Sequence, residues 1–425
     1  MRRTFQFVSF PSVLIASLVL LSTSSCRSGG RQVSVSGAPI RVSAADANGA
    51  EPAIAAAANG SFFVAWVNHG PARDADVMVA HFSPEGAIQG SAVRVNSQPG
   101  VATAWRGDPP TIAIAPDQTV FVGWTGRVQP DSGHATDIYL SASRDQGRTF
   151  SQPVKVNDDQ KSGPHGMHSL AVAGDGRIYV AWLDERNIAP MATMDPKMSE
   201  GTSGRHMESN REVFIASSAD GGRTFSPNKK VATNVCPCCK TALAVSAEGR
   251  LYVSWRQVLP GDFRHIAVAS STDQGETFTA PKIVSDDQWM IAGCPVSGPA
   301  ISTFSNGVLR VLWYSEGKNG ETGLYSSESK NGGINFGPRA LMAKGNIRGT
   351  PVLISDDKGL TAVWEGSGRE IMKSSLNHTA TGPSQFAAIA TGELPAAVQT
   401  SAKLIAAYVA KTEDHQAVWI VLSSF

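Results

Sequence analysis

The sequence has few charged residues, almost no net charge and no helical pattern beyond its first segment. Charged residues make up 17% of the 425 residues, and the formal net charge is +1. Proteins that hold nucleic acid need a strongly basic surface, so this composition gives no reason to expect a nucleic-acid partner. After residue 25, apolar residues do not recur with the 3.6-residue period of a helix. The 41 glycines and 24 prolines suit short strands joined by turns, so we expect an all-β domain.

Cysteine is also scarce, and the first of the five cysteines ends a segment with the features of a targeting signal. Arg2 and Arg3 precede an apolar run at 13–21, which is too short to span a membrane comfortably. The tetrapeptide Thr-Ser-Ser-Cys at 23–26 follows, and it resembles a bacterial lipobox in which threonine replaces the usual leucine. The segment therefore predicts export and a lipid anchor at Cys26.

These features divide the chain into three parts. We expect residues 1–26 to be a signal peptide with a lipobox-like Cys26, residues 27–37 to be a flexible tether, and residues 38–425 to form one domain in the cell envelope. Ordinary cleavage near Cys26 without lipid is the alternative. The pair Arg2-Arg3 fits either twin-arginine export or a plain signal peptide.

A short turn motif, Ser-x-Asp-x-Gly-x-Thr-Phe, occurs three times and once in a degraded form. Its aspartate can accept backbone N–H bonds and close a turn. Its glycine supplies a positive φ without steric cost, and its phenylalanine starts the returning strand and is placed to pack underneath. The motif predicts a β-hairpin with its own internal bracing. The copies are 143–150, 218–225, 271–278 and, degraded, 329–336.

A longer repeat consists of an apolar strand, a polar turn and a second apolar strand that ends near a tryptophan. The repeat positions are Trp66, Trp124, Trp182, Trp255, Trp313, Trp364 and Tyr408, at steps of 58, 58, 73, 58, 51 and 44 residues. Self-similarity of this period with β-type segments is the signature of a β-propeller. We expect antiparallel four-stranded blades with the tryptophans in the core. Seven blades are preferred, and six are the alternative because the last copy is the weakest.

The two ends of the domain are predicted to complete one blade. The last repeat stops after a third strand at 418–422, whereas residues 39–42 have the pattern of a fourth strand without a blade of its own. Pairing of these segments would close the ring, and closure removes the exposed strand edges that promote aggregation.

The turn motif resembles the Asp-box, or BNR repeat, of the sialidase-like β-propellers, and the resemblance covers nearly all of the domain. That family binds a substrate carboxylate with three arginines, and it uses a tyrosine nucleophile activated by glutamate and an aspartate acid/base at the mouth. Its Arg-Ile-Pro motif is not matched here, because Pro52, Pro110 and Pro351 have no arginine two residues before them.

The residues that could still act in glycoside hydrolysis are few, and each can also be a solvated loop charge or a strand-end aromatic. The candidates are Tyr314, Glu316, Asp184, Glu185, Arg106 and Arg348.

Soft donor side chains occur in the connections into three consecutive blades. Antiparallel strand order puts these connections on one face together with the loops after each second strand, and this face carries the central mouth. The overlong loop of the third blade adds Met191, Met194, Met198 and Met207. The candidate metal ligands are Cys236, Cys238, Cys239, Cys294, His165, Met167 and His168.

This set of donors leaves three interpretations open. Thiolates, thioethers and imidazoles together suit copper, particularly Cu(I). Four exported cysteines could instead form two disulfides that stiffen the mouth. The C-x-x-C spacing of Cys236 and Cys239 also allows a redox-active pair.

The first functional reading is an exported propeller that binds a ligand at its mouth, through a copper site or a disulfide-braced pocket. A sialidase-type glycoside hydrolase and a protein-interaction scaffold are the alternatives. We expect the partners to be a metal ion, small ligand or glycan at the mouth and the membrane through the lipid anchor. We expect the protein to be a monomer.

Overall fold

The computed structural model describes Met1 and residues 37–71, 74–103, 105–128, 134–160, 163–188, 211–291, 293–304, 306–356, 359–376 and 386–424. The chain divides into two compact units, 1–31 and 32–425. The signal segment, Cys26, the tether up to residue 36 and the four methionines of the overlong loop lie outside the described residues. The described residues form strands, and no helix among the described residues is long and apolar enough to cross a membrane.

The described strands fall into seven sets of four antiparallel neighbours. Sets one to three are β2 (Asn48–Ala56), β3 (Phe62–His69), β4 (Ala75–Phe82) and β5 (Val93–Arg94); β6 (Thr111–Ile114), β7 (Val120–Arg127), β8 (Thr136–Ser143) and β9 (Val154–Lys155); and β10 (His165–Val172), β11 (Ile178–Asp184), β12 (Arg211–Ser218) and β13 (Lys229–Val235). Sets four to seven are β14 (Ala242–Val245), β15 (Leu251–Leu259), β16 (Phe263–Ser271) and β17 (Lys282–Ile283); β18 (Ala300–Thr303), β19 (Leu309–Ser315), β20 (Gly323–Ser329) and β21 (Ala340–Lys344); β22 (Ile347–Asp356), β23 (Gly359–Gly366), β24 (Glu370–Leu376) and β25 (Phe386–Thr391); and β26 (Glu393–Gln399), β27 (Leu404–Lys411), β28 (Gln416–Ser423) and β1 (Ile40–Arg41).

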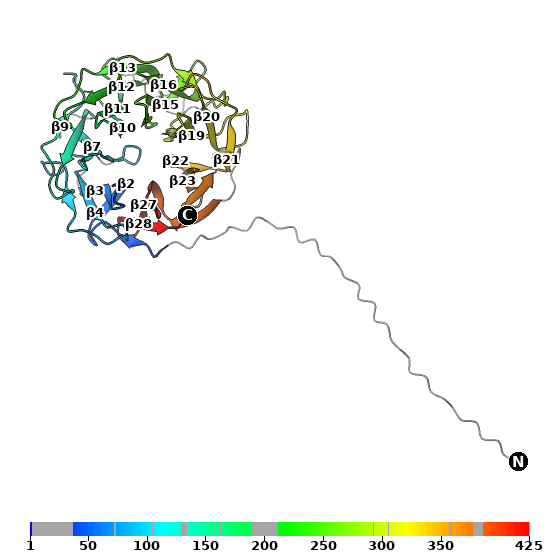
Figure 1. Ribbon diagram of the computed structural model, residues 1–425, viewed down its shortest axis with the longest axis horizontal. Helices are drawn as coiled ribbons and strands as arrows, with labels where there is room; N and C mark the ends of the chain where they lie inside the picture. Colours follow the sequence, from blue (N-terminus) through cyan, green and yellow to red (C-terminus); the bar gives the residue numbers. More distant parts are fainter. Residues whose placement is uncertain are drawn as a thin grey trace, which may run out of the picture. The chain divides into compact units, whose positions relative to one another are not determined.

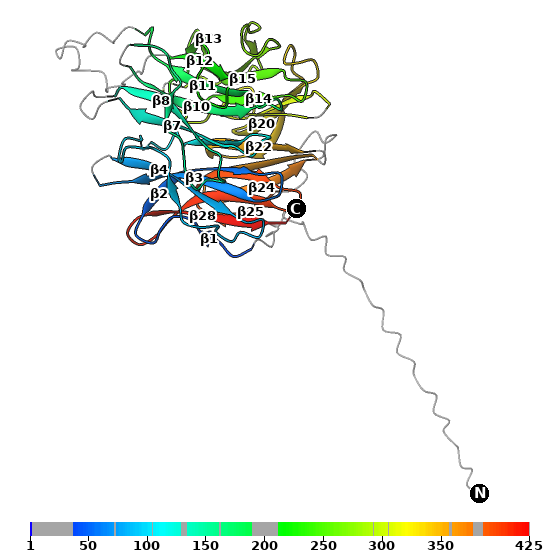
Figure 2. The ribbon, with the colours of Figure 1, turned by 60° about the vertical axis from the view of Figure 1, so that its left-hand side comes forward.

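The sets stand side by side around a central opening (Figures 1 and 2). Their first strands contact one another in a closed cycle that runs β2, β6, β10, β14, β18, β22, β26 and back to β2. Sets three and four also share one sheet, because Val235 at the end of β13 pairs with Gln257 of β15. This arrangement confirms the predicted all-β propeller with four-stranded antiparallel blades.

The core lies between neighbouring sets, as the two-sided apolar strands predict. One cluster joins Phe63 and Ala65 of β3 to Val120, Val122 and Trp124 of β7, and comparable clusters fill the other interfaces. All six repeat tryptophans and Tyr408 are buried, with at most 3% of each residue exposed. The tryptophans are therefore packing residues, as expected.

The N-terminal strand completes the last set. In β1, Ile40 pairs with Ile420 of β28, and the Val42 N–H donates to the Val418 carbonyl oxygen at 2.8 Å. Val42 is buried in the cluster between the seventh and first sets. The predicted closure is confirmed.

The Asp-box turns have the predicted internal bracing. Asp145 accepts from the Thr149 N–H at 2.9 Å and from the Thr149 hydroxyl at 2.6 Å, and Ser143 Oγ accepts from the Gly147 N–H at 2.8 Å. Phe150 packs against the cluster between the first two sets. The copies at 218–225 and 271–278 repeat these bonds, and Asn331 takes the aspartate's place in the degraded copy.

Deleting residues 38–43 is expected to lower the melting temperature markedly. The deletion exposes the edge of β28 and removes Val42, whose burial contributes about 1.5–3 kcal/mol, besides about 1 kcal/mol for each lost backbone hydrogen bond. Differential scanning fluorimetry checks this, with a deletion that ends at residue 36 and keeps β1 as the control. Equal melting temperatures for the two deletions would contradict the closure.

The Asp145→Ala variant is expected to be destabilised by about 1 kcal/mol at neutral pH. Hydrogen bonds, chiefly from Thr149, lower the pKa of Asp145 to about 2, below the roughly 3.9 of an unfolded chain. A depressed pKa stabilises the fold above the unfolded value, and this contribution disappears as the pH falls through the folded value. The melting-temperature gap to wild type should therefore shrink between about pH 4 and pH 2. Asn331→Ala removes the matching uncharged acceptor, so its gap should not follow this titration.

Candidate functional site at the propeller mouth

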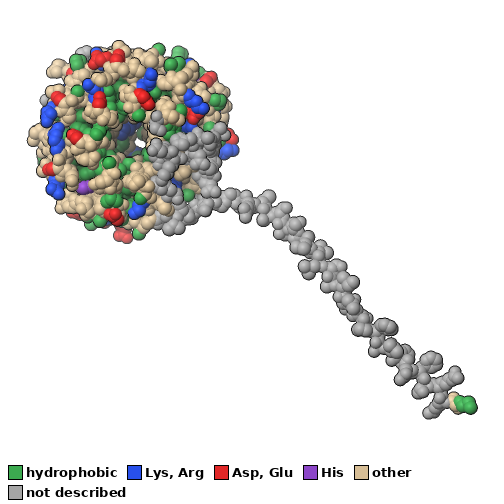
Figure 3. Space-filling model, in the orientation of Figure 1, with side chains coloured by type: hydrophobic (Ala, Val, Ile, Leu, Met, Phe, Trp, Pro, Cys, Tyr) green, Lys and Arg blue, Asp and Glu red, His purple; other side chains and the backbone are tan. Residues whose placement is uncertain are grey.

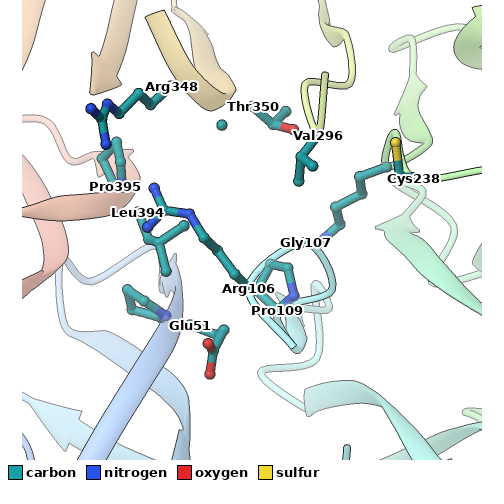
Figure 4. A pocket seen from close by; sticks show the side chains of 13 residues that line it. Glu51, Arg106, Gly107, Pro109, Cys238, Val296, Arg348, Thr350, Leu394 and Pro395 are labelled. Carbon is teal, nitrogen blue, oxygen red and sulfur yellow. The ribbon is translucent and has the colours of Figure 1, made fainter. Parts of the chain in front are cut away.

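The connections into the first strands surround a cavity of about 70 Å³ at the centre of the ring. Figure 3 shows the hollow in the middle of one face, and Figure 4 shows its wall. Glu51, Arg106, Lys240, Arg348 and Leu394 are among the lining residues, and they come from five different sets or connections. The face is the one that strand order predicts for the mouth.

Three basic side chains, those of Arg106, Lys240 and Arg348, line this cavity. Arg106 donates to Glu393 at 2.5 Å and to Glu365 at 2.9 Å, so its charge is balanced. Among the described residues, neither Arg348 nor Lys240 has an ion-pair partner. Burial lowers the pKa of Lys240 to about 8, although the charge of Asp108 acts in the opposite direction. In Figure 4, Arg106 and Arg348 extend toward the same side of the cavity, beside Leu394 and Pro395.

A wider groove of about 590 Å³ adjoins the cavity and shares Arg106 and Arg348 with it. Trp105, which is 44% exposed, and the buried Trp289 and Tyr314 give this groove an aromatic wall. Aromatic faces beside charged groups are the lining expected for a polar organic ligand such as a sugar.

Tyr314 carries a carboxylate contact of the kind that the sialidase resemblance implies. Its hydroxyl donates to Glu316 Oε1 at 2.6 Å and lies 3.2 Å from Asn346 Oδ1. Burial, and then the Glu316 carboxylate, raise the pKa of Tyr314. The structure thus brings together Tyr314, Glu316, Arg106 and Arg348 of the catalytic candidates.

The other two catalytic candidates lie elsewhere. Asp184 is fully buried, where it accepts from Trp182 Nε1 at 2.7 Å and pairs with Arg186 at 2.8 Å. Glu185 pairs with Arg211 at 2.5 Å. Neither is among the lining residues of the two cavities, and their contacts brace the third set.

Three cysteine sulfurs converge beside the cavity. The Sγ atoms of Cys236, Cys238 and Cys239 all lie within 4.8 Å of one another, and all three residues are buried. Cys236 Sγ is 3.8 Å from Cys238 Sγ and 3.4 Å from Cys239 Sγ. Cys238 also forms a disulfide with the exposed Cys294, with 6.1 Å between their Cα atoms. The four cysteines therefore form one bridge and two thiols, not the two bridges of the disulfide interpretation.

Backbone contacts hold the cysteine turn in this place. The Cys236 N–H donates to the Arg256 carbonyl oxygen at 2.9 Å, directly after the pairing of Val235 with Gln257. A side chain could not replace the hydrogen of Gly298, because a Cβ atom there would lie 2.2 Å from the Lys240 carbonyl oxygen. The loop that carries Cys294 thus packs directly on the cysteine turn.

The two thiols differ in acidity. Cys239 donates its S–H to Cys236, and this hydrogen bond lowers the pKa of Cys236 to about 6. Burial acts in the opposite direction, whereas the positive charge of Arg256 lowers the pKa further. Burial raises the pKa of Cys239. Cys236 is therefore the cysteine that is most readily a thiolate.

The predicted histidine ligands contact other groups. His165 Nδ1 lies 2.5 Å from the Thr136 carbonyl oxygen, and its Nε2 lies 3.2 Å from Asp159 Oδ1. His168 Nδ1 lies 3.3 Å from Asp108 Oδ1. Neither histidine is in the cluster of converging donors, whereas Met167 packs in the same apolar cluster as the three cysteines.

The sequence reading missed Arg256, which ties this region together. Arg256 is fully buried and donates to the carbonyl oxygens of Ser297 at 2.8 Å and Tyr314 at 3.0 Å. Its guanidinium carbon also lies 4.7 Å from the ring centre of Trp289. A signal for it existed, because Arg256, Tyr314 and Glu365 all follow a repeat tryptophan directly. In three consecutive sets that position holds a residue that lines the mouth or is hydrogen-bonded to one that does.

Solved structures of other proteins share the fold of this chain. No family model matches the chain, and no curated protein matches it. Among solved structures it is similar to a ulvan lyase of a polysaccharide lyase family, with 11% identity over 91% of this chain and 96% of that chain and a TM-score of 0.54. It is also similar to the Hadza microbial sialidase Hz136, with 13% identity over 85% and 76% of the two chains and a TM-score of 0.51.

An α-L-arabinanase of Penicillium chrysogenum is a third neighbour, with 14% identity over 81% of this chain and 98% of that chain and a TM-score of 0.50. These neighbours act on different glycans, and identities this low carry the fold and not the chemistry. The chain has the sialidase-like propeller fold shared by such hydrolases and lyases.

Proposed function

We propose that this protein is an exported propeller that binds a soft metal ion, Cu(I), at its cysteine cluster. The observation that carries the proposal is the convergence of three buried cysteine sulfurs within 4.8 Å beside the mouth. The three residues belong to one turn and pack in the apolar cluster that also contains Met167. The proposal places the protein in the cell envelope, anchored through Cys26.

The spacing of the sulfurs supports metal coordination. Metal–thiolate bonds of about 2.3 Å put the sulfurs of one ion roughly 3.7–4.0 Å apart. Cys236 Sγ lies 3.8 Å and 3.4 Å from its two neighbours, so small side-chain movements suffice. Reduction of the bridge to Cys294 would free Cys238 as the third thiolate. Arg256 adds positive charge near the thiolates, which partly balances an anionic thiolate–metal group.

Softness of the donors favours copper over other ions. Thiolates select Cu(I) and zinc over magnesium, calcium and manganese. The thioether of Met167 packs in the same cluster, and thioethers suit Cu(I) and are not usual zinc ligands. Two or three thiolates also satisfy Cu(I) without the histidines, which contact Asp108, Asp159 and Thr136.

Reduced wild-type protein is expected to bind one Cu(I) ion tightly, and the Cys236→Ser, Cys239→Ser double variant is expected to lose that binding. The double change removes two of three thiolates at the cluster. Titration of both proteins against a colorimetric Cu(I) chelator measures the difference, with zinc tested in parallel.

The matched control for this titration is Cys294→Ser. This variant cannot form the bridge, so Cys238 stays free and Cu(I) should bind without prior reduction. Equal weak binding by wild type and the double variant would refute the metal site. Tighter binding of zinc than of copper would refute the identity of the ion.

A sialidase-type glycoside hydrolase is the second candidate, and the Tyr314–Glu316 contact favours it. The pair lines the mouth groove beside Arg348, where a tyrosine nucleophile and its activating glutamate would be needed. Two observations oppose this candidate. Arg106 already forms ion pairs with Glu365 and Glu393, and the Arg-Ile-Pro motif is absent. A carboxylate substrate would meet only Arg348 and Lys240 as cations without an ion-pair partner among the described residues.

We expect wild type to release little or no sialic acid from a fluorogenic sialoside, because the three-arginine site is incomplete. If the groove is hydrolytic, Tyr314→Phe and Glu316→Gln should each slow turnover by more than about 10²-fold. Asp184→Asn lies away from the groove and is the comparison variant. Robust turnover that Tyr314→Phe abolishes would establish the second candidate in place of the expected inactivity.

A further inference from the structure

The four cysteines form a continuous series from the surface to the core. Cys294 is exposed and bonded to Cys238, of which 3% is exposed. Cys236 Sγ lies 3.8 Å from Cys238 Sγ, and Cys239 Sγ lies 3.4 Å from Cys236 Sγ. Cys236 and Cys239 are fully buried free thiols. Each sulfur in the series is therefore next to the following one.

A disulfide that lies next to free thiols can undergo thiol–disulfide exchange with them. Thiolates attack disulfide sulfurs through displacement, and the reaction needs contact between the attacking sulfur and the attacked one. The turn at 236–239 places Cys236 next to the bonded Cys238, while burial excludes external thiols from Cys236 and Cys239. Backbone anchors at Arg256 and Gly298 hold the two segments together in this arrangement.

We propose that the Cys238–Cys294 disulfide exchanges inward along this series. In the first step the Cys236 thiolate attacks Cys238 Sγ, the bond to Cys294 breaks, and Cys294 leaves as a thiolate. In the second step Cys239 gives up its proton as its sulfur attacks Cys236 Sγ, the Cys236–Cys238 bond breaks, and the leaving Cys238 sulfur takes up that proton. One disulfide and two thiols are present before and after, so no oxidant or reductant is consumed.

The two isomers present different groups to the outside. The first isomer closes the surface with a disulfide and keeps two thiols inside. The second stores the disulfide as Cys236–Cys239 and leaves Cys238 and the exposed Cys294 as a dithiol. The partner class is therefore a disulfide, in a protein or a small molecule, that Cys294 can attack and Cys238 can resolve. The exchange uses the cysteines of the proposed copper site but needs no metal, so it can be tested without copper.

Peptide mapping distinguishes the isomers directly. Trypsin releases residues 231–240, which carry Cys236, Cys238 and Cys239, and residues 283–310, which carry Cys294. The first isomer links the two peptides, and the second leaves them separate with a bond inside 231–240. The full-length protein is incubated in glutathione buffer with a metal chelator and without oxygen. Samples taken over a time course are quenched with acid, alkylated and digested.

The linked peptides of wild type should convert in part to the unlinked form, with Cys294 alkylated and an internal bond in 231–240. Cys239→Ser should stop the exchange at a Cys236–Cys238 bond, and Cys236→Ser should lose the internal bond entirely. Two results would refute the proposed exchange. In one, the two wild-type peptides stay linked and Cys236 and Cys239 are alkylated. In the other, wild type loses every disulfide without forming the internal one. The wild-type time course decides even where a serine variant fails to fold, and its outcome is independent of the copper titration.

Discussion

The pairing of β1 with β28 completes the last blade, and the packing of that blade against the first closes the ring. Each blade is apolar on both faces, so each face needs a neighbour, and an open ring would expose two of them at once. Val42 and Ile420 contribute to the cluster that fills this last interface. The first strands then surround a central cavity whose wall is made of residues from six places that are far apart in sequence. The mouth exists only because the ring is complete.

Arg256 holds together the segments that form one sector of the mouth. It is fully buried, it follows a repeat tryptophan on β15, and its donors reach the carbonyl oxygens of Ser297 and Tyr314 in the next blade. Its own carbonyl oxygen accepts from Cys236. Through its side chain and its backbone, one residue thus contacts the loop after Cys294, the strand end at Tyr314 and the start of the cysteine turn. A buried guanidinium needs such partners, since an unpaired one is costly.

The proposed metal site and the aromatic groove share this framework, although they differ in chemistry. Cys238 and Lys240 line the cavity that also contains Arg106 and Arg348, and the groove with Trp105 and Tyr314 continues from it. Glycan-active neighbours of the same fold illustrate how one scaffold carries different chemistries at the mouth.

The sequence by itself determined the propeller, its closing strand and its braced turns, because these features are periodic or local. A repeated tryptophan, a Ser-x-Asp-x-Gly turn and a strand without a blade can be read without knowing any distance. It also placed the cysteines, Tyr314 and Arg348 on one face, since strand order alone fixes the face. Only the tertiary structure decided which of these side chains meet. Side-chain direction and bulges at the first strands turned His165 and His168 toward Asp159 and Asp108. The same packing buried Asp184 beside Trp182 and brought Cys294 to Cys238 across 56 residues of chain, which no spacing rule could specify.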